Sequence, residues 1–194
     1  MKHYEEKIAG SLLFIGGVQF VLGIILAEAL YPGYNTSNQT ISSLGVGPSA
    51  VIFNSSVFLI GVLGLAGTYF VHRAFNFSLF TLLLGIAFIG AIGVGLFTEA
   101  TSTFTLHSIF AVTAFVFGGI SAIISYKLQK QPLAILSVIL GVFSLSAMAL
   151  LASGIYLGLG LGLGGIERMV AYPIILWTVG FGGHLIAQEG MKQK

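Results

Sequence analysis

The chain has 194 residues, of which 56% are hydrophobic and only 7% are charged, and its mean hydropathy is +1.01. Soluble domains carry about 25% charged residues, so this composition excludes a soluble fold and predicts a polytopic membrane protein. The net charge of +2 comes without a clustered basic patch, so we expect no nucleic-acid partner. The absence of cysteine excludes disulfide bonds, thiolate catalysis and cysteine-ligated metals.

Six stretches of the chain are long and apolar enough to cross a bilayer, which takes ~20 residues. In chain order they cover about 8–30, 50–72, 77–97, 105–126, 132–155 and 167–187. The sequence therefore predicts an all-α fold, in which residues 1–194 form one integral membrane domain built as a bundle of six helices.

Seven of the eight basic residues fall on one side of this bundle, which predicts that this side faces the cytoplasm. They lie before the first span, in the short connections 73–76 and 127–131, and after the last span. We therefore expect both termini in the cytoplasm of a multi-pass protein of the cell membrane. The connections on the other side, at 31–49, 98–104 and 156–166, are longer, which suggests that any site opens outward.

Glycine is abundant, and it recurs at a spacing of three at Gly61, Gly64 and Gly67 in the second span. Small residues let membrane helices approach closely, so these glycines predict tight helix packing. The same faces would also suit a homodimer. The Leu-Gly run at 158–165 has a second interpretation, as a flexible or re-entrant segment near the outer surface. Trp177, near the middle of the last span, is expected to pack in the core.

The longest polar run, residues 31–45, has no charge but is dense in hydroxyl and amide groups. It lies on the predicted outer face, where the charged or titratable side chains are Glu28, Glu99, His107, Glu167 and Arg168. Ionisable groups at membrane depth usually face a cavity or a partner. We therefore expect these residues to line an outward-facing polar cavity, with residues 31–45 as its lid.

Arg168 is the one basic residue that departs from the charge bias, and it follows Glu167 directly. Adjacent helical residues point about 100° apart, so each side chain is expected to reach a different neighbour. A guanidinium can grip a carboxylate or a phosphate through two hydrogen bonds, which would suit a ligand. The alternative is an inter-helix clamp from Arg168 to Glu28 or Glu99.

Two site hypotheses follow from this cluster. In the first, a membrane lipid or another amphipathic small molecule binds, and the binding residues are Arg168, Glu167, Glu28, Tyr34 and Ser42.

In the second, the protein is a membrane-embedded hydrolase of a lipid or amide bond. His107 would act as base, Glu99 or Glu167 would orient it, and Ser43 or Ser42 would be the nucleophile. No nucleophile-elbow pattern surrounds the serines. A transporter is the least favoured class, since no polar residues line the middle of the spans. We expect no metal site, and the sequence indicates no particular cofactor.

Several short motifs also resemble those of a known family. They are Pro32-Gly33-Tyr34, Ile41-Ser42-Ser43-Leu44-Gly45, His107 at the start of a helix, Gly165-Ile166-Glu167-Arg168, and Trp177. Together they resemble, over nearly the whole chain, a prokaryotic six-span membrane family catalogued as a domain of unknown function, the 998 family. The resemblance implies a six-helix bundle with these outer-face residues as its polar signature. Members often carry an acidic residue where this chain has Ser43, which weakens an acid–base role for the loop.

Overall fold

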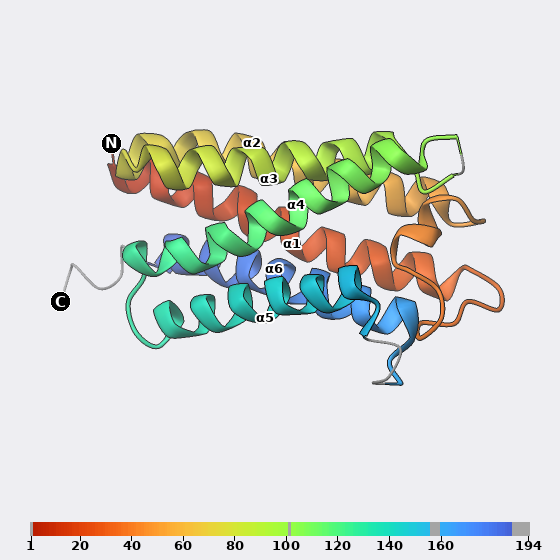
Figure 1. The fold of residues 1–194 in the computed structure, drawn as a ribbon. Coiled ribbons are helices and arrows are strands. Elements are labelled where there is room, and N and C mark those ends of the chain that lie inside the picture. The colour runs from red at the N-terminus through yellow and green to blue at the C-terminus, as the bar shows by residue number, and fades with distance from the viewer. Residues whose placement is uncertain (1, 101, 156–159, 188–194) are drawn as a thin grey trace.

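The chain forms a bundle of long α-helices in the computed structural model, which describes residues 2–100, 102–155 and 160–187 (Figure 1). Within those ranges there are six long helices and no strands. Their bounds are α1 (Lys2–Ala29), α2 (Ala50–Phe75), α3 (Ser78–Leu96), α4 (Phe104–Ile124), α5 (Leu133–Ser153) and α6 (Gly162–Ala187). The same ranges include two 3-10 helices, η1 (Ser42–Gly45) and η2 (Ser125–Leu128). The predicted all-α fold with six membrane-length helices is confirmed.

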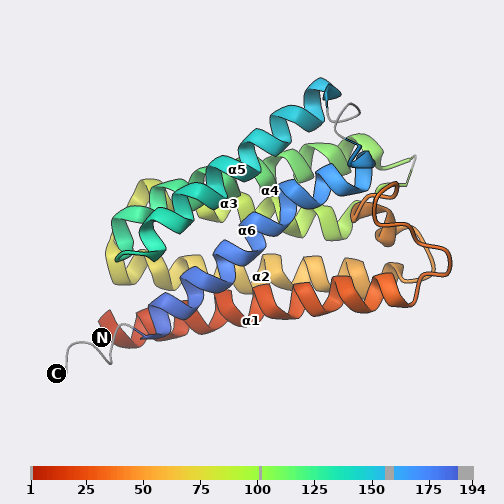
Figure 2. The same cartoon turned by 90° about the horizontal axis from the view of Figure 1, so that it is seen from below.

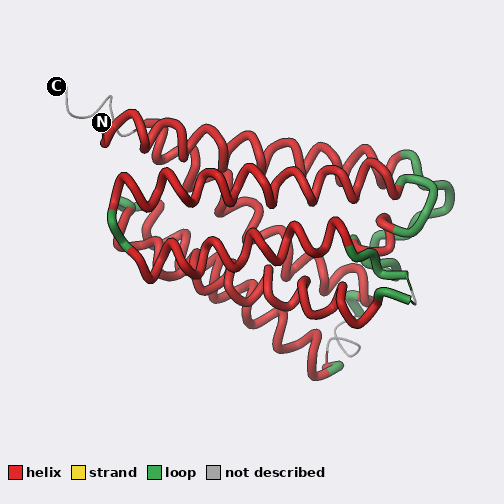
Figure 3. The backbone as a smooth tube through the Cα atoms, turned by 90° about the horizontal axis from the view of Figure 1, so that it is seen from above, coloured by secondary structure: helices red, strands yellow, loops and turns green. Residues whose placement is uncertain are grey.

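The helices are arranged as a ring, in which each packs against the next in chain order and α6 returns to α1. Figure 2 shows α1 and α6 side by side. Consecutive helices are antiparallel, so α1 begins and α6 ends at the same end of the bundle, which we call the terminal end (Figure 1). The long connection between α1 and α2 lies at the opposite end, the loop end (Figure 3). That the terminal end faces the cytoplasm stays a prediction.

The start of α6 differs from the prediction, because the helix begins at Gly162 rather than near Glu167. Glycine is a poor helix former, so the glycine-rich residues before Glu167 do not predict a helix. In the structure, the amides of Gly164 and Gly165 donate to the Ser37 carbonyl at 2.8 and 3.2 Å, which anchors this first turn. Glu167 and Arg168 therefore lie inside α6 and are buried, instead of opening the helix.

Glycines bring neighbouring helices into close contact. A Cβ atom on Gly10 of α1 would lie 2.6 Å from the Gly182 carbonyl oxygen of α6, and one on Gly61 would lie 2.7 Å from the Ile92 amide of α3. The tight packing predicted for Gly61 is confirmed, and Gly10 is a further close contact that was not predicted. Because these glycine faces contact helices of the same chain, a homodimer through them stays a prediction. Positions 158 and 159 of the Leu-Gly run lie outside the described residues.

The outside of the ring carries large exposed apolar side chains on every helix. Examples are Leu22, Leu65, Leu82, Val112, Ile139 and Leu176. Such a surface is suited to contact with lipid hydrocarbon rather than with water. Each of the six helices has the length and composition to cross the hydrocarbon core of a bilayer. The chain is therefore an integral membrane protein.

Candidate functional site

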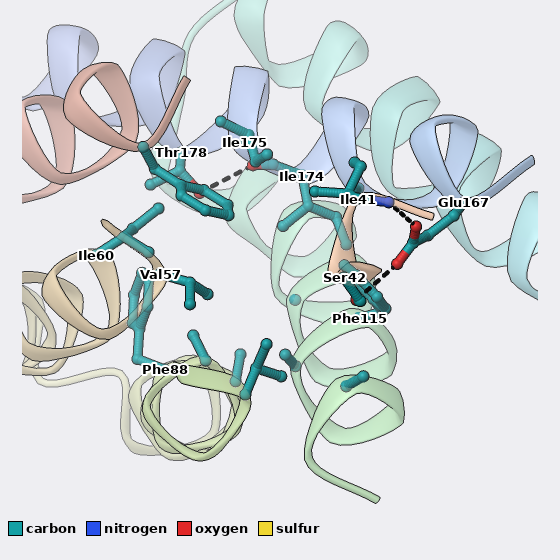
Figure 4. Close-up of a pocket in the computed structure, with 18 of the residues that line it drawn as sticks. Ile41, Ser42, Val57, Ile60, Phe88, Phe115, Glu167, Ile174, Ile175 and Thr178 are labelled. Carbon is teal, nitrogen blue, oxygen red and sulfur yellow. Dashed lines mark hydrogen bonds between the residues drawn. The ribbon is translucent and has the colours of Figure 1, made fainter. Parts of the chain in front are cut away.

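An apolar cavity lies inside the ring, between α1, α2, α3, α4 and α6 (Figure 4). Its volume is about 90 Å³, several times the ~10–15 Å³ that one water molecule needs. Aromatic and aliphatic side chains form most of its wall, including Phe20, Phe53, Phe88, Phe115, Ile175 and Trp177. The sequence led us to expect a polar lining, and this lining is instead apolar.

The connection between α1 and α2 closes one end of this cavity. We call its residues 31–45 the cover segment, and Ile41 and Ser42 of this segment line the cavity. Glu167 of α6 holds both residues, because one carboxylate oxygen accepts a short hydrogen bond from the Ile41 amide. Its other oxygen accepts a hydrogen bond of 2.8 Å from the Ser42 hydroxyl. Figure 4 shows Glu167 pointing toward these two residues at the edge of the cavity.

Arg168 holds the rest of the cover segment. Its two terminal nitrogens donate to five protein oxygens at 2.6–3.1 Å, namely the carbonyls of Thr36, Gln39 and Gly164, the Glu28 carboxylate and the Tyr34 hydroxyl. The pair with Glu28 is 2.6 Å long and joins α6 to α1, with the two side chains 9% and 21% exposed. The predicted pairing of Glu28 with Arg168 is confirmed. The arginine is an inter-helix clamp that also fixes the cover segment.

The two adjacent residues of α6 divide the cover segment between them. Glu167 binds its second half at Ile41 and Ser42, whereas Arg168 binds its first half and Glu28. Successive side chains on a helix point about 100° apart, which is why neighbours in sequence reach different partners. The prediction that these two side chains contact different neighbours is confirmed.

Tyr34 lies between Arg168 and the cover segment's own backbone. Its hydroxyl accepts from the Arg168 guanidinium at 2.7 Å and donates to the Thr40 carbonyl at 2.6 Å. The guanidinium carbon lies 5.6 Å from the centre of the Tyr34 ring. Burial, partly offset by the hydrogen bond from Arg168, raises the pKa of the Tyr34 phenol above its usual 10.0. The phenol is therefore a neutral hydrogen-bond donor at physiological pH.

The start of α6 provides the surface on which the cover segment lies. A Cβ atom on Gly164 would overlap the carbonyl oxygens of Gln39 and Thr36, so only glycine admits this approach. Gly162 has φ +67° and would place a Cβ against Ser37. The Ser37 hydroxyl also donates to the Leu161 carbonyl at 3.0 Å. Backbone contacts therefore join the cover segment to α6 in addition to the charged side chains.

The three residues predicted as catalytic are each hydrogen-bonded elsewhere. His107 is buried, with its Nδ1 2.8 Å from the Phe97 carbonyl, and because a carbonyl only accepts, Nδ1 carries the proton. The Ser43 hydroxyl donates to the Thr40 carbonyl at 2.7 Å, and Glu99 accepts from the Thr40 hydroxyl at 2.8 Å. Among the described residues, no hydrogen bond joins His107, Ser43 and Glu99 to one another. The hydrolase stays a prediction.

Sequence reasoning missed the cavity wall, although part of its signal is present in the sequence. Small side chains recur at helical spacing, at Ala87 and Ala91 on α3 and at Ala111, Ala114 and Gly118 on α4, and all of them line the cavity. Phenylalanine rings also line the cavity, from α1 and α2 as well as from these two helices. Trp177 packs in the core as predicted, donating to the Ser125 hydroxyl at 3.0 Å, and it also lines the cavity.

Comparison with known proteins identifies the family of the chain. Neither the curated proteins nor the solved structures include a match. A family model described as "Protein of unknown function (DUF998)" matches residues 14–184. This range includes Glu28, the cover segment, Glu167 and Arg168, and it agrees with the resemblance of the short motifs. Since the match spans most of the chain, the protein belongs to the DUF998 family.

Proposed function

We propose that the cavity binds the hydrocarbon chain of an amphipathic membrane molecule, and that the cover segment regulates access to it. The observation that supports this proposal is the distribution of polarity in the cavity wall. Glu167 and Ser42 lie together at the end closed by the cover segment, while the wall beyond them is almost entirely apolar. Thr178, the other polar residue of the wall, donates its hydroxyl to the Ile174 carbonyl of its own helix.

The polar end favours a small headgroup that donates hydrogen bonds. Both Glu167 oxygens accept hydrogen bonds from the cover segment, so a hydroxyl or amine of the ligand would replace one of these donors without leaving the carboxylate unsatisfied. An anionic headgroup would meet the Glu167 carboxylate and is disfavoured. Arg168 already donates to five protein oxygens, which supports its role as a clamp over a role in gripping the ligand.

The sole tryptophan of the chain makes this proposal testable. Trp177 lines the cavity and is 3% exposed, so its fluorescence reports contact with a bound chain. The protein is reconstituted in lipid nanodiscs and titrated with a long-chain alcohol that carries bromine in mid-chain. We expect saturable quenching that the unbrominated alcohol reverses, and weaker quenching by the matched brominated carboxylic acid.

A size-matched pair of variants separates the cavity from the surrounding bilayer. Ala171→Phe adds a ring to the cavity wall one helical turn after Glu167, toward the terminal end. Ala66→Phe adds the same ring at an exposed position of α2. The first variant is expected to lose the saturable quenching and the second to keep it, with a cooperative melting transition showing that both are folded. Quenching that rises linearly with the alcohol and is equal in both variants would contradict the proposal.

A further inference from the structure

A second hollow lies on the outside of the bundle, between α2 and α3 near the terminal end. We call it the α2–α3 groove, and its volume is about 470 Å³. Its residues recur at spacings of three and four, which places them on one face of each helix. They are Leu65, Thr68, Tyr69 and His72 on α2, and Ser78, Thr81, Leu82, Gly85, Ile86 and Ile89 on α3. None of them lines the internal cavity.

The groove is polar at the terminal end and apolar toward the middle of the bundle. The end of α2 and the beginning of α3 bring His72 next to Thr81, whose hydroxyl lies 3.1 Å from His72 Nδ1. Deeper in the groove, the lining changes to Leu65, Ile86 and Ile89. This gradient has the same direction as that of a bilayer leaflet, whose headgroups lie at the surface and whose chains lie inside.

Hydrocarbon is the natural occupant of the deeper part. The large side chains on the rim, such as Leu82 and Ile89, are more than half exposed on the lipid-facing surface. A void there would forfeit dispersion contacts, and water would lack polar partners. Gly85 opens the space, since a Cβ atom at this position would have only ordinary contacts of 3.8 Å with Leu65 and Thr68. A lipid acyl chain fits both the shape and the location.

The basic side chains around the polar part of the groove favour an anionic headgroup. Within the described part of the chain, the exposed Lys and Arg side chains at the terminal end are Lys2, Lys7, Arg73, Lys127 and Lys130. The acidic residues described at that end, Glu5 and Glu6, are both buried, and Glu5 pairs with Arg73 at 2.8 Å, so the basic side chains outnumber the acidic ones there. Arg73 contacts the groove lining, because its guanidinium carbon lies 5.9 Å from the centre of the Tyr69 ring and it donates to the Tyr69 hydroxyl at 3.3 Å.

We propose that the α2–α3 groove binds a membrane phospholipid with an anionic headgroup. Its acyl chain lies along Leu65, Ile86 and Ile89, and its phosphate lies near Arg73 and His72. Basic side chains at a membrane surface attract anionic lipids, and the terminal end is the one predicted to face the cytoplasm. This site is separate from the internal cavity and does not depend on the ligand proposed there.

Native mass spectrometry tests the site with two lipids that have identical acyl chains, phosphatidylglycerol and phosphatidylcholine. They are supplied in equal amounts to the protein in detergent. We expect the wild type to retain phosphatidylglycerol in preference to phosphatidylcholine. Gly85→Leu fills the groove and is expected to lose the retained lipid. Gly180→Leu is the matched control and should retain the lipid, since Gly180 is exposed on α6 and a Cβ atom there would have no neighbour within 4 Å.

Two more variants make the outcome decisive. Leu65→Phe fills the groove from α2 and is also expected to lose the retained lipid. It serves as the groove-filling variant if Gly85→Leu does not fold. Arg73→Gln is expected to lower the ratio of phosphatidylglycerol to phosphatidylcholine about fivefold, while the total lipid retained stays the same. Equal retention of the two lipids by the wild type would overturn the anionic selectivity. Wild-type retention by a folded groove-filling variant would overturn the site itself.

Discussion

The two arginines at opposite ends of the bundle have very different surroundings. At the loop end, the Arg168 side chain is 9% exposed and donates to five protein oxygens. At the terminal end, the Arg73 side chain is 49% exposed and contacts the Glu5 carboxylate at 2.8 Å and the Tyr69 hydroxyl. One arginine is enclosed by a loop that lies over it, and the other remains at the surface of the bundle.

This difference shows that the charge itself does not determine the role of a charged residue in this membrane protein. A buried charge must have partners, and removing one partner leaves the other uncompensated. Arg168 therefore contributes to the fold, because it ties α6, α1 and the cover segment together. Arg73 pairs with the buried Glu5 but is itself half exposed, so solvent screens the pair and the guanidinium can also reach lipid headgroups. The following predictions test this contrast.

The largest effect is expected from Arg168→Met. This change leaves the Glu28 carboxylate unpaired and frees three carbonyls, so we expect a loss of about 3–5 kcal/mol in the free energy of unfolding. Equilibrium unfolding in mixed detergent micelles measures it. Glu28→Gln in the same background should add little further loss, because the pair is already broken. Additive losses from the two changes would show that the two side chains act independently.

Gly164→Ala should have the next largest effect. Its Cβ would overlap the backbone of the cover segment at Gln39 and Thr36, and such overpacking costs about 1–3 kcal/mol. The matched control on the same helix is Gly180→Ala, which has nothing within 4 Å and should leave stability unchanged or raise it by about 0.5–1 kcal/mol. Equal effects of the two changes would contradict the close packing of the cover segment on α6.

The raised pKa of Tyr34 predicts that the free energy of unfolding depends on pH in the alkaline range. Burial raises the pKa of its phenol above 10.0 in the folded state, so the unfolded chain loses this proton first as the pH rises. The contribution of the neutral phenol to the free energy of unfolding is therefore fully present below pH 10. It declines as the pH rises through the folded-state pKa. Unfolding measured from pH 9 to about pH 12 should show this decline in the wild type. Tyr34→Phe should make the curve flatter, and a curve unchanged by this substitution would exclude Tyr34 as its source.

The smallest effect is expected from Arg73→Gln. Arg73 is half exposed, so solvent screens its side of the ion pair with the buried Glu5, and we expect only a small decrease in the melting temperature. A loss as large as that of Arg168→Met would remove the contrast between the two ends of the bundle.

The sequence was sufficient for the parts of the structure that depend on side-chain type. Hydropathy located the six spans, and the unusual position of Arg168 indicated either a ligand or a clamp to Glu28 or Glu99, of which the structure shows the Glu28 pair. The docking of the cover segment was not predictable in the same way, because Arg168 and α6 bind the carbonyls of Thr36, Ser37 and Gln39, and every residue has a carbonyl. The cavity depends on how side chains from five helices fit together, which spacing along one helix does not reveal.

The closed state of the cover segment is the central claim, and a single introduced thiol tests it directly. The chain has no cysteine, so Val57→Cys places the only thiol in the cavity wall, at a position that is 4% exposed. A water-soluble maleimide is added to this variant and to the same variant carrying Arg168→Met. We predict slow labelling when Arg168 is present and much faster labelling when it is replaced, with a long-chain alcohol slowing the second reaction. Fast and equal labelling of both proteins would contradict the claim that the cover segment closes the cavity.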